Sequence, residues 1–168
     1  LPILKKYDYT ATCFFVTSTI GKKNFWDINK KSYISKEIMT DNDINLWLSS
    51  GMNIGSHSHN HFNLTTLSLD KLNYELKVSQ RILEDKFGHK IENFCYPYGK
   101  VNKLVYERTR DIFLKAFTTN RARFDTNNHD LCLIPRIDMG KDISLFKILL
   151  KLETVYEDIK FKKNELYL

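Results

Sequence analysis

The chain has 168 residues, and its 26 lysines and arginines outnumber its 20 aspartates and glutamates, which gives a formal net charge of +6. Its length suits one domain with a sizeable core, and we expect a single domain over residues 1–168. The basic residues are scattered in pairs and do not form an aromatic or glycine-rich nucleic-acid motif, so we expect no nucleic acid partner. No apolar run of the sequence is long enough to cross a membrane.

The first half of the chain alternates apolar runs with amphipathic stretches. Residues 1–6 are typical of the end of a helix, and residues 11–17 form an apolar run with β-branched and aromatic side chains. Such a run predicts a strand that is buried on both faces. Thr40 predicts the N-cap of a helix that ends before Gly51, and residues 52–56 predict a second strand.

The second half continues the alternation. The clearest helix begins at Ser68 and is ended by Gly88. Strands separated by helices predict an α/β fold with a largely parallel sheet or barrel, whose functional residues gather at the carboxyl ends of the strands. The remaining predicted elements are strands at 91–96, 116–119 and 131–137 and helices at 104–113 and 142–156.

Three cysteines occupy apolar runs: Cys13, Cys95 and Cys132. An odd number in such settings predicts small buried side chains and not a disulfide framework.

A cluster of histidines follows the predicted strand 52–56. His57 and His61 can converge on one ion if the backbone turns between them, and His59 then points elsewhere, which makes it the third choice. Imidazole is the commonest zinc ligand, and a bound metal lowers the pKa of water and polarises a carbonyl for hydrolysis. The alternative is a polar turn whose histidines only cap the next helix.

Two later strand ends also carry chemical groups. Pro97, Tyr98 and Gly99 form a rigid turn that can direct a backbone N–H at a developing oxyanion, although an ordinary turn is the alternative. Arg136 stands between Pro135 and an isoleucine, so we expect it to be partly buried and to have a carboxylate or substrate partner. A structural ion pair is the alternative for this arginine.

Taken in this order, the segments resemble the polysaccharide deacetylase family, also called carbohydrate esterase family 4. The resemblance runs from Leu1 to about Met139. Residues 53–65 are similar to the family's His-(Ser/Thr)-x-x-His metal motif, and residues 94–99 are similar to its third motif. Residues 1–16, 116–119 and 133–137 resemble further strands and a helix of the family.

The resemblance implies a distorted (β/α) barrel that removes N-acetyl or O-acetyl groups from an amino-sugar polysaccharide or glycolipid of the cell envelope. The partner would be an acetylated glycan or a lipid-linked amino sugar. The family's divalent metal, with zinc favoured over cobalt or nickel, would be held by one aspartate and the residues matching His57 and His61. Tyr98 would stabilise the oxyanion through its backbone N–H and would contact the substrate together with Pro97. Arg136 would supply the positive charge that many members carry at the position of Cys95.

The chain also departs from the family pattern. Both acidic residues of the first motif would lie upstream of Leu1, so we expect an incomplete barrel without its first strand. We expect this chain alone to be inactive unless Asp125 or Asp138 moves into the site. The family's late histidine has no match, and His129 is a poor substitute.

Two other functions stay open at this point. One is a degenerate deacetylase-like domain that binds glycans without catalysis, and the other is a metal-binding or basic interaction module unrelated to sugars. The sequence leaves the compartment open between the cell envelope and the cytoplasm.

Overall fold

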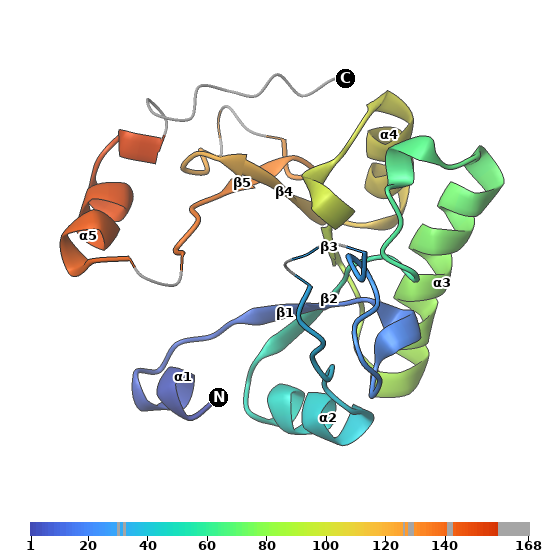
Figure 1. Ribbon diagram of the computed structural model, residues 1–168, viewed down its shortest axis with the longest axis horizontal. Helices are drawn as coiled ribbons and strands as arrows, with labels where there is room; N and C mark the ends of the chain where they lie inside the picture. Colours follow the sequence, from blue (N-terminus) through green and yellow to red (C-terminus); the bar gives the residue numbers. More distant parts are fainter. Residues whose placement is uncertain (30, 32, 126, 128–129, 141–142, 158–168) are drawn as a thin grey trace.

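A computed structural model describes residues 1–157 except 30, 32, 126, 128, 129, 141 and 142, and its centre is a five-stranded sheet (Figure 1). The strands lie in the order β1-β2-β3-β4-β5, and each neighbouring pair is parallel. A sheet whose spatial order follows the chain order is wound in one direction, as in a (β/α) barrel. The strands are Thr12–Phe15, Asn53–Ser56, Asn93–Cys95, Lys115–Arg121 and Ile134–Arg136.

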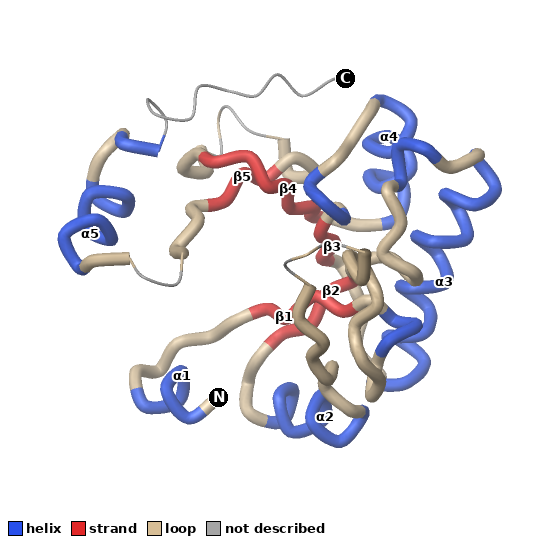
Figure 2. Tube along the Cα trace, in the orientation of Figure 1, coloured by secondary structure: helices blue, strands red, loops and turns tan. Residues whose placement is uncertain are grey.

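A helix lies in each of the first three connections between strands, as the alternating sequence pattern predicts, whereas the described residues between β4 and β5 form no helix. In Figure 2, α3 and α4 lie side by side next to the sheet, whereas α1 and α5 stand on the other side of the view. The α/β prediction is therefore confirmed, and β1 and β5 are the two edges of the sheet that the described residues form. The helices are α1 (Pro2–Lys6), α2 (Asp41–Ser49), α3 (Leu69–Phe87), α4 (Lys103–Ile112) and α5 (Leu145–Glu153), with 3₁₀ turns η1 (Thr17–Thr19), η2 (Leu64–Thr66) and η3 (Pro97–Gly99).

Helix α3 contributes several apolar side chains to the core. Ser68 is its N-cap residue, and Gly88 ends it in the left-handed conformation with φ 67°. Leu72, Leu76 and Leu83 point from its buried face into the core and are 0% exposed. The two boundaries agree with those predicted from the sequence.

Strand β2 is closely packed at Gly55. A Cβ atom at Gly55 would lie 2.6 Å from the ring of Phe14 and 2.9 Å from the carbonyl oxygen of Asn93. Only glycine fits between these neighbours, so the residue that precedes the histidine segment is fixed by packing.

Several predicted elements differ from the observed ones: β3 is shorter than the predicted strand 91–96, and β4 is longer than the predicted strand 116–119. Thr12 at the start of β1 is exposed, whereas Phe15 and the following Val16 are buried, so the predicted burial on both faces holds only at the carboxyl end of the predicted strand 11–17. β5 is shorter than the predicted strand 131–137. Hydrogen bonds to Asp130 from the backbone N–H groups of Cys132 (2.6 Å) and Leu133 (3.0 Å) hold the preceding residues in a turn.

The last helix also differs from its prediction. α5 begins at Leu145, and the predicted start at Asp142 lies outside the described residues. Its apolar stripe predicts the helix correctly, yet most of the stripe faces solvent: Leu145 is 71% exposed and Leu149 is 49% exposed.

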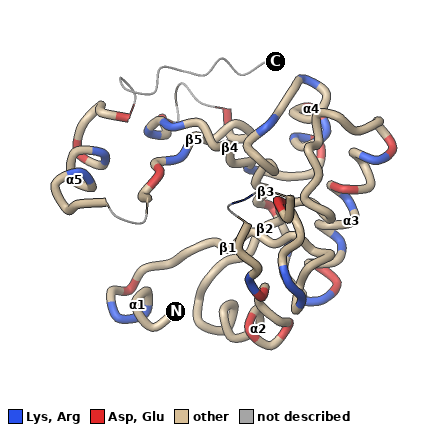
Figure 3. Tube along the Cα trace, viewed as in Figure 1, with Lys and Arg blue, Asp and Glu red and all other residues tan. Residues whose placement is uncertain are grey.

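Charges are dispersed over the described part of the molecule. Figure 3 shows lysines and arginines interspersed with acidic residues along the helices, without one broad basic face. Within the described ranges, no helix is long and apolar enough to cross a membrane. The three cysteines are free, and Cys95 and Cys132 are buried as expected.

The difference in burial between two leucines predicts different losses of stability when each is replaced by alanine. Leu76 is 0% exposed and Leu46 is 58% exposed. Leu76→Ala should lower the free energy of unfolding by about 2–5 kcal/mol because it leaves a cavity. Leu46→Ala should change it by less than about 0.5 kcal/mol. Urea unfolding followed by circular dichroism measures both, and equal effects would contradict the assigned core.

Candidate active site

The segment after β2 turns so that two histidine rings meet. The ring centroids of His57 and His61 lie 4.7 Å apart at an interplanar angle of 76°. Ser58 and His61 have positive φ values of 65° and 56°, which reverse the chain direction between the two rings. Buried Ser58 also accepts a hydrogen bond from the backbone N–H of His61 at 3.0 Å. The turn expected from the spacing is therefore present.

The ring of His57 is fixed by the end of the neighbouring strand. Its Nδ1 lies 2.6 Å from the carbonyl oxygen of Cys95. A carbonyl only accepts, so Nδ1 carries the proton and donates it, and the lone pair of the neutral ring is on Nε2. This is the arrangement in which a histidine can bind a metal through Nε2.

Burial favours the neutral form of the same ring. It lowers the pKa of His57, and the positive charge of Arg136 acts in the same direction, while the hydrogen bond to Cys95 opposes them. A neutral imidazole is the form that binds metal ions. The donor chemistry of His57 therefore fits a divalent metal.

His59 is directed to a different place. Its Nδ1 lies 2.8 Å from Oγ1 of Thr17, and its ring packs edge-on against Tyr74 with the centroids 5.7 Å apart. The structure thus brings His57 together with His61 and leaves His59 out of the pair, in the order of choice that the sequence indicates.

The turn η3 lies beside the histidine pair. Tyr98 has a positive φ of 59°, and its ring lies edge-on to His61 with the centroids 4.7 Å apart. The N–H of Gly99 donates to the carbonyl of Tyr96 at 2.9 Å and closes the turn after buried Pro97. Tyr98, which the sequence places after a strand end, thus lies at the same site as the two histidines.

An aromatic residue that the sequence analysis did not single out also contacts the site. Trp26 stacks on His61 with the ring centroids 4.7 Å apart and the planes at 19°, and Phe25 lies edge-on to Trp26. Both come from the connection between β1 and α2. An adjacent pair of large aromatics in an otherwise polar loop was the signal that could have identified them.

Arg136 is exposed, so the expectation that it is partly buried is wrong. Arg136 is carried by β5, at the edge of the described sheet. The Nε of Arg136 donates to the carbonyl of Thr118 at 2.7 Å. It lies close enough to His57 for its charge to lower the pKa of that histidine. Its proposed catalytic role stays a prediction.

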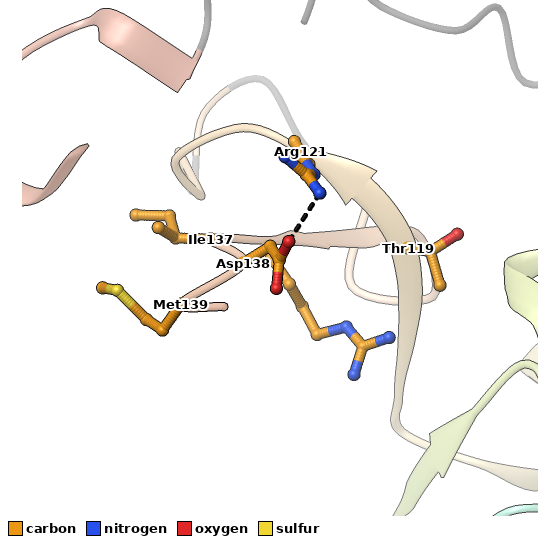
Figure 4. Close-up of a pocket in the computed structure, with 6 residues that line it drawn as sticks. Thr119, Arg121, Ile137, Asp138 and Met139 are labelled. Carbon is orange, nitrogen blue, oxygen red and sulfur yellow. Dashed lines mark hydrogen bonds and ion pairs between the residues drawn. The ribbon is translucent and has the colours of Figure 1, made fainter. Parts of the chain in front are cut away.

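A cavity of about 380 Å³ lies next to Arg136. Figure 4 shows Arg121 reaching from β4 to Asp138, and the Nη2 and Oδ2 atoms of this ion pair are 2.5 Å apart. Thr119 lines the cavity and also packs against Gly99, so the cavity adjoins the turn η3. The other lining residues are Ile137 and Met139.

A third metal ligand is not found beside the two histidines in the described part of the chain. The residues placed there contain no group of three or more His, Cys, Asp or Glu that could hold a metal ion. Asp138 pairs with Arg121, and Asp125 accepts a hydrogen bond from the backbone N–H of Asn127 at 2.9 Å. His129 lies outside the described residues.

The fold and the site together define an architectural class. A parallel sheet wound in one direction, with two imidazoles and a rigid turn after its second and third strands, is a (β/α)-type fold whose polar groups gather at the carboxyl ends of the strands. Residues 1–117 match the family model of polysaccharide deacetylases, so the chain belongs to the polysaccharide deacetylase family.

Individual relatives agree with the family assignment. The chain is 29% identical over 150 residues to a poly-β-1,6-N-acetyl-D-glucosamine N-deacetylase of Staphylococcus aureus, covering 84% of this chain and 49% of that protein. The Staphylococcus epidermidis protein of the same name is 27% identical over 158 residues, covering 89% and 52%. The chain thus spans about half the length of the curated relatives it matches.

A solved structure has the same fold. The Streptococcus pyogenes deacetylase PplD, in complex with acetate, superposes with a TM-score of 0.77 at 25% identity, covering 91% of this chain and 63% of that one. The deacetylase-type α/β fold expected from the sequence is confirmed.

The tight contact at η3 predicts a destabilising substitution. Gly99 has a φ of 67°, and a Cβ there would lie 1.9 Å from Oγ1 of Thr119. Gly51 has a φ of 78° but no atom within 4 Å of such a Cβ, so Gly51→Ala measures the backbone strain alone. Gly99→Ala should lower the free energy of unfolding by about 1–3 kcal/mol more than Gly51→Ala, because it adds overpacking to the same strain. Urea unfolding compares the two, and an equal loss would contradict the close contact between the turn and β4.

Proposed function

We propose that this chain forms part of the active site of a metal-dependent carbohydrate deacetylase, with His57 and His61 as two of the metal ligands. The observation that carries the proposal is the convergence of the two rings, 4.7 Å apart, with Nδ1 of His57 fixed by the carbonyl of Cys95. A divalent ion, with zinc favoured over cobalt or nickel, would supply Lewis-acid activation for the hydrolysis of an acetyl amide or ester.

The remaining polar groups have roles on the substrate side. Tyr98 follows β3 and lies against His61, so its backbone N–H is the proposed donor to the oxyanion, and Pro97 fixes the turn. Arg136 contributes positive charge at the same edge of the sheet, since its charge is felt by His57. Trp26 and Tyr98 both contact His61 and offer aromatic surface to a sugar ring.

The proposed substrate is an acetylated amino-sugar polymer of the cell envelope. Relatives from two staphylococci are named as N-deacetylases of poly-β-1,6-N-acetyl-D-glucosamine, which supports an N-acetyl group on glucosamine. Removal of O-acetyl groups, or action on a lipid-linked amino sugar, falls within the same chemistry. The cavity beside η3 has room for a neighbouring sugar unit.

The described residues hold no group of three ligands that includes the two histidines, and we propose that the acidic ligand and the general base are the aspartates of the family's first motif, which has no match in this sequence. The 168-residue chain alone should therefore bind metal weakly and release no acetate. The same observation favours the second candidate function, a degenerate domain that binds acetylated glycans without hydrolysing them.

Metal binding tests the ligand assignment directly. His57→Ala should weaken Zn²⁺ binding about tenfold or more, because it removes a ligand, whereas exposed His89 serves as the matched control and His89→Ala should leave binding unchanged. Competition with a chromophoric chelator measures the affinity. Equal affinities of the two variants would contradict the site.

Acetate release separates the enzyme from the glycan-binding domain. The chain and a longer form with any residues encoded before Leu1 should be incubated with an N-acetylglucosamine oligomer, with and without a chelator. We expect no acetate from the chain and chelator-sensitive release from a form that carries the acidic residues. Release that survives the chelator would contradict the proposal, and glycan binding without release from either form would support the second function.

A further inference from the structure

Glu75 is a buried carboxylate that the proposed chemistry does not use. It lies on α3, and only 2% of its surface is exposed. Glutamate is rarely buried to this extent without partners that satisfy its oxygens. In the described part of the chain, no lysine, arginine or histidine forms an ion pair with it, so its partners must be of another kind.

Those partners belong to the segment between the two histidines. Oε2 accepts hydrogen bonds from the backbone N–H of His59 at 3.0 Å and from that of Asn60 at 2.7 Å. Oε1 accepts from the side-chain amide of Asn60 at 2.7 Å. Both oxygens of one side chain thus bind two consecutive residues of the turn, and hydrogen bonds of N–H groups to an ionised acceptor are stronger than average.

The three hydrogen bonds from His59 and Asn60 to Glu75, here called the clamp, lie between the two histidines in the chain. His57 lies two residues before His59, and His61 follows Asn60 directly. The Glu75 carboxylate therefore sets the backbone position from which both histidine side chains extend. Without secondary structure of its own, the turn would otherwise leave the N–H groups of residues 59 and 60 to water. A fixed turn presents both rings before any ligand arrives, which lowers the cost of binding.

A second contact on the same helix face supports this interpretation. Ser79 lies one turn after Glu75, and it accepts a hydrogen bond from buried Ser56 at 2.7 Å. Ser56 is the last residue of β2. Two polar residues interrupt the otherwise apolar buried face of α3, and each binds one part of the segment that carries the histidines.

We infer that Glu75 is the positioning residue of this site: its carboxylate fixes the turn and thereby sets His57 and His61 for metal binding. The inference rests on the proposed function for its metal-binding part. It assigns no contact between Glu75 and the metal or the substrate.

Glu75→Gln tests the inference because it keeps the volume and removes the charge and one acceptor. In the metal-free chain, the backbone amides of His59 and Asn60 should exchange hydrogen about tenfold faster or more, as the clamp weakens. The affinity for Zn²⁺ should fall about 10–100-fold, the usual effect of losing a residue that orients ligands. Asp85→Asn is the control, since Asp85 is an exposed carboxylate of the same helix whose partner is Arg81, and it should change neither quantity.

Asn60→Asp tests the same clamp from the other side if Glu75→Gln does not fold. It places a second carboxylate against Glu75 and leaves α3 intact, so it should also accelerate exchange and weaken Zn²⁺ binding. Unfolding in urea, measured for every variant, separates a loss of stability from a loss of ligand position, because a merely structural Glu75 would change stability and leave the Zn²⁺ affinity of the folded protein unchanged.

Wild-type exchange rates at both amides, or a wild-type Zn²⁺ affinity, in a folded Glu75→Gln chain would overturn the inference. A wild-type chain that binds no Zn²⁺ would defeat the proposed function separately. In that case the amide exchange alone still decides whether Glu75 holds the turn.

Discussion

The hydrogen bond between Nδ1 of His57 and the carbonyl oxygen of Cys95 joins the ends of two neighbouring strands, and the rest of the site depends on it. It forms because β2 and β3 are parallel and both end at the same edge of the sheet, with Ser56 opposite Phe94. The close packing at Gly55 allows this approach. One contact therefore fixes the tautomer and orientation of the first histidine and brings the turn η3, which follows Cys95, next to the second.

The turn between the histidines is held from two sides: by Glu75 on α3, and by the backbone N–H groups of Thr17 and Ser18, which donate to the carbonyls of Ser58 at 3.3 Å and His59 at 3.0 Å. Glu75 accepts hydrogen bonds from three N–H groups of His59 and Asn60, and Ser58 accepts one from His61. Positive φ values at Ser58 and His61 are maintained by these surroundings. The strand end, the turn and α3 thus form one unit, and a change in any of them should alter the position of both rings.

Most of the fold could be predicted from local patterns, because caps and apolar periodicity act over a few residues. Ser68 and Gly88 bound α3 as predicted, and the runs before the histidines and before Pro97 are strands. The prediction of burial failed at the first residue of β1 and the last residue of β5: Thr12 and Arg136 are exposed, because burial depends on what packs on each face of the sheet at that position. The apolar stripe of α5 predicts a helix, but it does not say what the helix packs against.

The sequence by itself determined the family, the order of the elements and the choice of His57, His61 and Tyr98, because the spacing of these residues after strands is a local property. Only the tertiary structure decided how the two rings meet, that Trp26 stacks on His61, and that Glu75 holds the turn. These contacts join residues distant in the chain, and their geometry depends on how strands and helices pack. A glutamate on a helix is usually a solvent-facing charge, so only its burial against the turn revealed its place in the site.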